Sequence, residues 1–168
     1  PGVRPVPAET PDMYLSRLNG AAKHSVPSPV AVVVSYPSNP TAQVVDLDFY
    51  KEIVAFARRF DMWILSDLAD SELYFDGNPP PSILQVPGAI DIAVEFTSMS
   101  KTFSMAGWRI GFAVGNDRLL AALGRVQSYL HYAPFTPLPA AAAAAAQGPT
   151  AVHPGSTPAT QRQPTRSG

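Results

Sequence analysis

Apolar residues gather into short uninterrupted runs along the middle of the chain. The first run covers residues 30–36 and reads VAVVVSY, and later runs cover residues 62–66, 90–96 and 109–114. A continuous run rich in β-branched residues is typical of a strand that is buried on both faces of a sheet. The pattern therefore predicts four strands, the first two of them fully buried.

Two segments carry apolar residues at helical spacing, and each follows an aspartate that is suited to cap a helix. After Asp46 the stripe consists of Phe49, Ile53, Phe56 and Phe60. After Asp117 it consists of Leu119, Leu123, Val126 and Leu130. The spacing predicts one amphipathic helix after each aspartate.

The order of these elements indicates the fold class. A strand, a helix, a strand, a loop and a further strand in succession are the signature of an α/β protein with a mostly parallel sheet and flanking helices. Residues 97–108, between the third and fourth strands, show no helical period. Parallel neighbours usually need a crossover helix, so we expect this last pair to be antiparallel within a mixed sheet.

The two ends of the chain differ from its middle. Of 19 prolines, six fall in the first 29 residues and seven in the last 36. Residues 1–29 are therefore predicted to be a Pro-rich segment with a short helix at 13–18, and residues 30–147 the folded domain. The alanines at 140–146 favour a helix. Residues 148–168 have almost no apolar side chain, which predicts a disordered tail.

Composition and charge exclude several classes of function. The 168 residues include 12 basic and 13 acidic side chains, which leaves no electrostatic footprint for nucleic acid or an anionic membrane. The absence of cysteine excludes disulfides, thiol nucleophiles and Cys-ligated metals. No apolar run approaches the roughly 20 residues of a membrane helix. We expect a cytoplasmic globular protein with no metal site.

Polar residues follow the predicted strands where ligands bind in an open α/β sheet, outside the carboxyl ends of the strands. They are Ser38, Asn39 and Thr41 after the first strand, Asp67 after the second, and Thr97, Ser98, Ser100 and Lys101 after the third. This set suits a ligand that carries a phosphate and a protonatable ring nitrogen. Simpler interpretations stay open, because Asn39-Pro40 is a common turn pair and Asp67 could cap a turn.

The segment around Lys101 carries a more specific pattern. Residues 98–111 read SMSKTFSMAGWRIG, with an arginine eight residues after the lysine. Together with Asn39-Pro40-Thr41 and Asp67, this segment resembles the lysine region of fold-type I pyridoxal-phosphate enzymes, the aspartate aminotransferase superfamily. The phrases SNPTAQ, PSILQVPGA and IAVEF are most similar to the branch of alanine and LL-diaminopimelate aminotransferases. The resemblance covers about residues 14–148 and implies part of that family's large domain.

The resemblance implies a role for each matching residue, with pyridoxal 5′-phosphate as the cofactor. Lys101 would form the internal Schiff base and then move the proton at the substrate's α-carbon. Asp67 would keep the pyridine nitrogen protonated, and Asn39 would bind the ring's 3′ oxygen. Ser98 and Arg109 would hold the phosphate.

The sequence departs from the family at Asp70 and in length. Relatives have a tyrosine at the position of Asp70, and that tyrosine donates a hydrogen bond to the 3′ oxygen. An ionised carboxylate cannot donate, so we expect slower amino-group transfer unless Asp70 points to solvent. The family's upstream phosphate loop and downstream substrate-binding arginine have no counterpart here, which predicts an incomplete catalytic domain.

Several functions stay open at this point. The resemblance implies a homodimeric aminotransferase acting on an amino acid and a 2-oxo acid, although lyases and synthases of the superfamily share the same residues. The alternative is a non-catalytic remnant that binds cofactor weakly or associates with intact subunits. A nucleotide-binding domain is disfavoured, because no phosphate-binding glycine loop occurs. Gly107, Gly111 and Gly115 are instead expected to permit close backbone packing.

Overall fold

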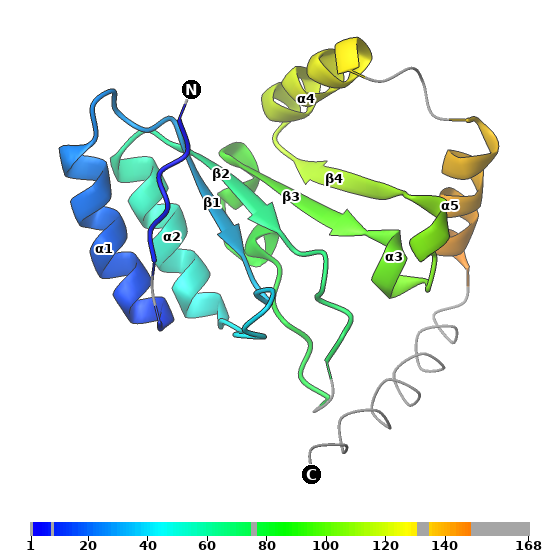
Figure 1. The fold of residues 1–168 in the computed structure, drawn as a ribbon, viewed down its shortest axis with the longest axis horizontal. Coiled ribbons are helices and arrows are strands. Elements are labelled where there is room, and N and C mark those ends of the chain that lie inside the picture. Colours follow the sequence, from blue (N-terminus) through cyan, green and yellow to red (C-terminus); the bar gives the residue numbers. More distant parts are fainter. Residues whose placement is uncertain (1, 8, 75–76, 131–134, 149–168) are drawn as a thin grey trace.

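The computed structural model describes residues 2–7, 9–74, 77–130 and 135–148 and contains one four-stranded sheet (Figure 1). Its strands are β1 (Ala31–Ser35), β2 (Trp63–Asp67), β3 (Ala93–Ser98) and β4 (Gly111–Gly115), in that spatial order. Strands β1, β2 and β3 are parallel, whereas β4 is antiparallel to β3. The predicted mixed α/β sheet is therefore confirmed, including its antiparallel last pair.

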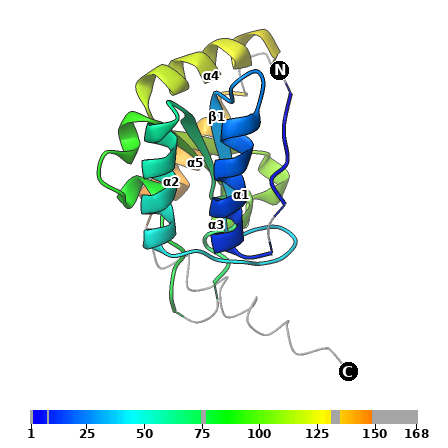
Figure 2. The ribbon, with the colours of Figure 1, turned by 90° about the vertical axis from the view of Figure 1, so that its left-hand side faces the viewer.

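Two helices cover one face of this sheet, α1 (Pro11–His24) and α2 (Leu47–Arg59), which lie side by side (Figure 2). Asp46 caps α2 as predicted, because its carboxylate accepts a hydrogen bond of 2.8 Å from the Phe49 N–H. Thr10 caps α1 in the same way through the Met13 N–H. Helix α1 is longer than the predicted helix at 13–18, because this cap starts it at Pro11 and the helix continues to His24.

The hydrophobic core lies between α1, α2 and the sheet. Two short 3₁₀ helices, η1 (Ile83–Gln85) and η2 (Ala89–Asp91), complete its cover. The fully buried residues include Ile53, Ile64, Ile83, Ala89 and Ala93. The aromatic rings of Tyr36, Phe49 and Tyr50 pack edge to face within the same core. This packing lies against the parallel strands β1, β2 and β3 and stabilises their register.

Strand β1 is buried on one face only, and Trp63 and Leu65 on the same open face of β2 are only half-buried, so the prediction that both strands are fully buried is wrong. Val32 is 4% exposed, whereas its neighbour Val33 is 59% exposed. Helices α1 and α2 both pack on the face of Val32. Helix α4 (Asp117–Leu130) lies against the other end of the sheet, mainly along β3 and β4, with Arg118 over the Trp63 ring of β2. A run of valines fits an extended backbone on either face and does not report which face is covered.

Helix α4 and the alanine-rich α5 (Pro137–Gln147) complete the described structure, and neither buries a side chain. The predicted alanine helix is confirmed as α5. Asn116, not Asp117, caps α4, because its side chain accepts hydrogen bonds from the N–H groups of Arg118 and Leu119. Beyond residue 148 the predicted tail lies outside the described residues.

Backbone contact between β3 and β4 is tight at two glycines. A Cβ atom added at Gly111 would lie 2.6 Å from the carbonyl oxygen of Thr97. One added at Gly115 would lie 2.3 Å from the carbonyl oxygen of Ala93. The expected close packing is confirmed at these two positions. At Gly107 it is wrong, since a Cβ atom there would meet open space.

Among the described helices, none combines the length and the apolar character that crossing a bilayer requires. Within the same residues, no three histidine or acidic side chains are grouped so that they could hold a metal ion.

Candidate functional site

The carboxyl ends of three parallel strands meet at one edge of the sheet. The register pairs Ser35 of β1 with Asp67 of β2, and Asp67 with Phe96 of β3. The loops that follow these strands are therefore neighbours. They carry Asn39 after β1, Asp67 and Asp70 at β2, and Lys101 after β3.

Asp67 is the last residue of β2 and is exposed. One of its carboxylate oxygens accepts a hydrogen bond of 3.3 Å from the Ser35 hydroxyl, and the other accepts one of 3.1 Å from the Ala69 N–H. A carboxylate has about four acceptor sites, so both oxygens can still bind a further donor. The two bonds fix the orientation of a carboxylate that remains open to a ligand.

Asp70 lies three residues later in a folded turn. The Ser71 N–H donates to the Leu68 carbonyl, the Leu73 N–H to the Asp70 carbonyl, and the Leu68 N–H to the Phe96 carbonyl of β3. The turn is thereby tied to the neighbouring strand. The Asp70 carboxylate lies 3.0 Å from the Lys101 Nζ, so the Asp70 side chain points to Lys101 rather than to solvent.

Lys101 belongs to α3 (Met99–Thr102), a short helix that follows β3 directly. Ser98 caps this helix by accepting a hydrogen bond of 3.2 Å from the Ser100 N–H. Met99 is buried and anchors the other side of the turn. A hydroxyl can accept one hydrogen bond and donate another, so Ser98 can cap the helix and still bind an anion.

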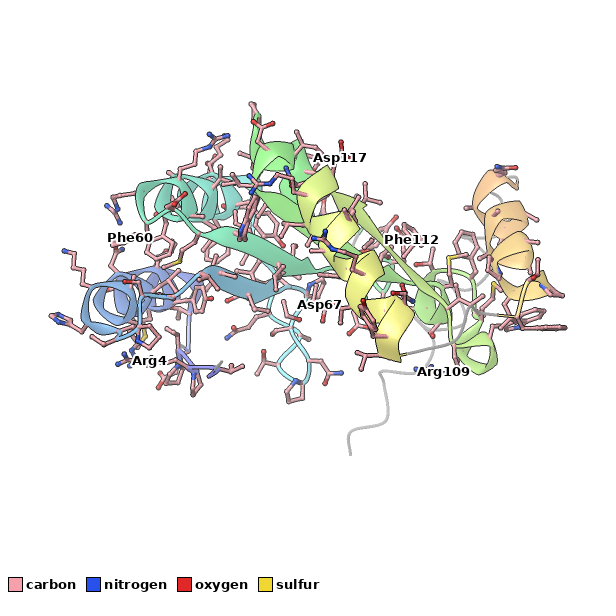
Figure 3. The ribbon with its side chains drawn as sticks, turned by 90° about the horizontal axis from the view of Figure 1, so that it is seen from above. Arg4, Phe60, Asp67, Arg109, Phe112 and Asp117 are labelled. Carbon is pink, nitrogen blue, oxygen red and sulfur yellow. The ribbon has the colours of Figure 1, made fainter. Side chains whose placement is uncertain are left out.

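Arg109 comes before β4, and the hydrogen bond from the Met99 N–H to the Ile110 carbonyl holds this segment beside the start of α3. Its backbone is left-handed at φ 53°, and its guanidinium donates a bond of 3.2 Å to the Ala106 carbonyl. Figure 3 shows Arg109 ahead of β4 and Asp67 at the end of β2. An exposed guanidinium has further N–H groups for a ligand.

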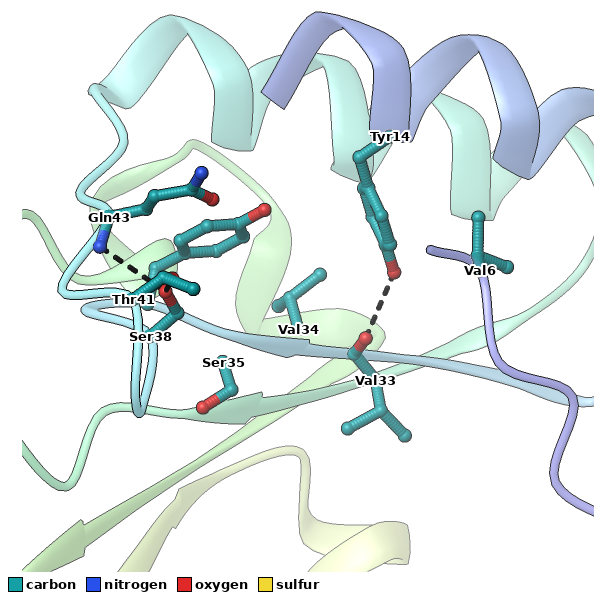
Figure 4. A pocket seen from close by; sticks show the side chains of 9 residues that line it. Val6, Tyr14, Val33, Val34, Ser35, Ser38, Thr41 and Gln43 are labelled. Carbon is teal, nitrogen blue, oxygen red and sulfur yellow. Dashed lines mark hydrogen bonds between the residues drawn. The ribbon is translucent and has the colours of Figure 1, made fainter. Parts of the chain in front are cut away.

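Asn39 lies exposed in the loop after β1, and its loop neighbours Ser38 and Thr41 line a cleft of about 230 Å³ (Figure 4). At one end of the cleft, the Tyr14 hydroxyl donates a bond of 3.0 Å to the Val33 carbonyl, and burial raises the pKa of Tyr14 to about 12. At the other end, the Ser38 hydroxyl accepts from the Gln43 N–H. Sequence reasoning missed this cleft, because its walls come from three separate segments.

A buried carboxylate, Glu95, lies one position inside the sheet edge. It accepts hydrogen bonds of 2.7 Å from the Ser82 hydroxyl and 3.0 Å from the Ile83 N–H, and a longer one from the Ser66 hydroxyl. Burial raises the pKa of Glu95 above its usual 4.5. These bonds fasten η1 to the sheet, so Glu95 has a structural role that the sequence pattern did not reveal.

The edge as a whole offers a primary amine, two carboxylates, a guanidinium, hydroxyls and an amide on adjacent loops. The structure brings Asp70 and Lys101 into direct contact and joins Ser98 to the helix of Lys101. Asn39 and Arg109 are exposed on the loops after β1 and before β4, and no contact joins either of them to this pair among the described residues. Such a set can bind an anion and hold or move protons.

The sequence that forms this edge of the sheet is similar to that of known aminotransferases. AatC of Rhizobium meliloti (strain 1021), a putative aminotransferase, is 59% identical over 146 residues, which cover 87% of this chain and 36% of that protein. The glutamate-pyruvate aminotransferase AlaC of Escherichia coli (strain K12) is 49% identical over 146 residues, covering 87% of this chain and 35% of AlaC. The chain thus spans about a third of the length of these curated relatives.

Solved structures agree with the curated relatives. The aspartate aminotransferase from Rhizobium meliloti superimposes with a TM-score of 0.78 at 28% identity, covering 88% of this chain and 37% of that one. BacF from Bacillus subtilis superimposes with a TM-score of 0.72 at 34% identity, covering 78% and 35%. The family model described as aminotransferase class I and II matches residues 3–164. On this match and these identities, the chain belongs to the class I and II aminotransferases, a pyridoxal-phosphate-dependent family.

Proposed function

We propose that this chain forms the cofactor-binding part of an aminotransferase that moves an amino group from an amino acid to a 2-oxo acid. The observation that carries the proposal is the position of Lys101, which follows the carboxyl end of β3 next to β2, the strand that ends at Asp67. A primary amine and a carboxylate on neighbouring strand ends are what a pyridine aldehyde requires. Family membership supports the same cofactor.

The side chains present fit pyridoxal phosphate by their chemistry. Lys101 supplies the amine that binds the aldehyde carbon, and the exposed carboxylate of Asp67 can accept the proton of a pyridinium nitrogen. Ser98 and Arg109 supply a hydroxyl and a guanidinium for the phosphate. Asn39 supplies an amide for the ring's 3′ oxygen.

Each residue then has a task in amino-group transfer. When bound, the cofactor supplies an electron sink for the substrate's α-carbon. Asp67 holds the proton at the ring nitrogen. The hydrogen bonds that its carboxylate accepts from Ser35 and Ala69 fix the orientation of that carboxylate. Lys101 takes and returns the proton at the α-carbon. Ser98 and Arg109 keep the phosphate end fixed, so the reacting atoms stay within reach of Lys101.

The names of relatives support the substrate class. One relative is a glutamate-pyruvate aminotransferase, and several are LL-diaminopimelate aminotransferases. We include an amino acid and a 2-oxo acid as substrates in the proposal on that ground. A homodimer of the whole protein and a cytoplasmic location complete it, as the family resemblance implies.

A second candidate is a non-catalytic remnant that binds cofactor weakly or associates with intact subunits. The observation that favours it is the exposed apolar surface of β4 and α4, which includes Phe112, Val126 and Leu130. Such a surface suits contact with another chain. Size-exclusion chromatography with and without pyridoxal phosphate distinguishes a discrete folded binder from an associating remnant.

The proposal is tested by titrating the purified chain with pyridoxal phosphate, reducing with borohydride and mapping the labelled peptides by mass. We expect one saturable adduct at Lys101, which Lys101→Ala abolishes and the control Lys51→Ala retains. Transfer assays with alanine, glutamate and diaminopimelate as donors then measure turnover. Equal, unsaturable labelling of Lys23, Lys51 and Lys101 would contradict a cofactor site.

A further inference from the structure

The carboxylate of Asp70 occupies the position that faces the amine of Lys101. The Asp70 Oδ1 and the Lys101 Nζ are 3.0 Å apart, within the range of a charge-assisted hydrogen bond. The two side chains are 24% and 39% exposed, so water screens the pair only in part. The sequence motif gives no hint of this contact, because it places the two residues 31 positions apart.

The topology makes the contact a built feature of the fold. Strands β2 and β3 are adjacent and parallel, so the turn after Asp67 and the helix after Ser98 emerge at the same edge. The Leu68 N–H donates to the Phe96 carbonyl at 2.8 Å, which fixes the base of the turn against β3. Both partners of the ion pair are therefore carried on backbone that is itself held in place.

We infer that Asp70 is a positioning residue that holds the Lys101 Nζ in an ion pair, which must break before Lys101 captures a carbonyl ligand, and so slows that capture. This inference deepens the proposed function and rests on it for the identity of the natural ligand. For capture, the ammonium must first leave Asp70 and give its proton to the buffer. The neutral amine then adds to the aldehyde carbon, and water leaves as the C=N bond forms.

The size of the effect follows from the exposure of the pair. Breaking a partly exposed ion pair costs little free energy, so removing Asp70's charge is expected to speed capture by only about two- to five-fold. Because salt screens such pairs over about 3 Å at 1 M ionic strength, the gain should shrink at high salt. A purely structural role for Asp70 would produce neither the gain nor its salt dependence.

The chain contains a matched control pair. Asp48 and Lys51 form an exposed ion pair of 2.7 Å near the start of α2, and neither belongs to the candidate site. Asp70→Asn removes the charge at the candidate pair and keeps the shape of the side chain, and Asp48→Asn does the same at the control pair. Asp70→Glu restores the charge and is expected to restore slow capture.

The experiment measures labelling rates of Lys101, Lys51 and Lys23 by peptide mass mapping in the full chain, with borohydride supplying the hydride that reduces the C=N bond. Formaldehyde and pyridoxal phosphate are used in separate arms. We expect Asp70→Asn to speed labelling of Lys101 about two- to five-fold at low salt and to leave Lys51 unchanged. Asp48→Asn should affect Lys51 alone. Circular dichroism confirms that each variant is folded.

The two arms separate this inference from the proposed function. If formaldehyde labels Lys101 faster in Asp70→Asn while pyridoxal phosphate finds no site, the ion pair has its inferred role and the cofactor assignment fails. If pyridoxal phosphate binds Lys101 saturably but Asp70→Asn changes neither rate, the inference is overturned and the function stands. An equal gain at all three lysines would also overturn it.

Discussion

Residues 11–99 and residues 111–148 both carry amphipathic patterns, yet the two regions are packed differently. In the first region, α1, α2 and β2 enclose a core in which Ile53 and Ile64 are fully buried. In the second, no described residue of β4, α4 or α5 is buried, and Val126 of α4 is 55% exposed. An apolar stripe specifies a helix, whereas burial also needs a surface to receive the stripe.

The candidate site lies along the boundary between these regions. Asp67 and Asp70 belong to the packed region, and Lys101 follows β3 at its border. Arg109 precedes β4 in the open region and is itself exposed. Asp67 and Lys101 thus have firm support from the packed region, whereas Arg109, one of the two groups that would bind the phosphate, has less.

The difference in packing between the two regions predicts the largest loss of stability for a substitution in the core of the packed region. Ile53→Ala removes a fully buried side chain beneath the sheet and should lower the free energy of unfolding by about 2–5 kcal/mol. Val126→Ala, the matched change in α4, should alter it by less than about 0.5 kcal/mol. Urea denaturation monitored by circular dichroism measures both. Comparable losses in the two variants would show that α4 is packed after all.

Replacing either of two glycines in the open region by alanine should change the free energy of unfolding by an intermediate amount, with opposite signs at the two positions. Gly115→Ala would place a Cβ 2.3 Å from the Ala93 carbonyl oxygen at φ 151° and should cost about 1–3 kcal/mol. Gly124→Ala enters open space on α4 and should stabilise that helix by about 0.5–1 kcal/mol. Urea midpoints and helix content test the pair. A tolerated Gly115→Ala would mean that β4 is loosely held against β3.

The smallest expected effect concerns the buried acid Glu95. Because burial raises its folded-state pKa above 4.5, the folded chain binds a proton more readily than the unfolded chain. The free energy of unfolding should therefore fall as the pH rises from 4.5 through the folded-state pKa. Glu95→Gln should remove that decline, whereas the control Glu52→Gln, exposed on α2, should keep it. Identical pH profiles for wild type and Glu95→Gln would contradict the assignment.

Much of the fold followed from local pattern. The valine run of β1, the Asp46 cap and the stripe of Phe49 and Ile53 predicted elements that the structure contains. The missing helical period before β4 predicted an antiparallel pair, which is present. Burial did not follow from pattern, because Val33 and Val126 have the same chemistry as their buried counterparts and differ only in what covers them.

The sequence could place site residues at the edge of the sheet only where it predicted the end of a strand. The topology rule brought Asn39, Asp67 and Lys101 to one edge, because parallel strands end together. The ion pair between Asp70 and Lys101 and the buried bonds of Glu95 depend on the register between β2 and β3. A single sequence carries no record of that register, so these contacts required the structure.

Hydrogen exchange of the full chain, with and without pyridoxal phosphate, tests the central claim most directly. Without cofactor, peptides from α2 and β2 should exchange most slowly and those from α4 fastest. On adding cofactor, new protection should concentrate in residues 67–74 and 98–110 at the strand ends, and Lys101→Ala should abolish it. Protection that is unchanged by cofactor, or that appears mainly in α4, would contradict a cofactor site at this edge.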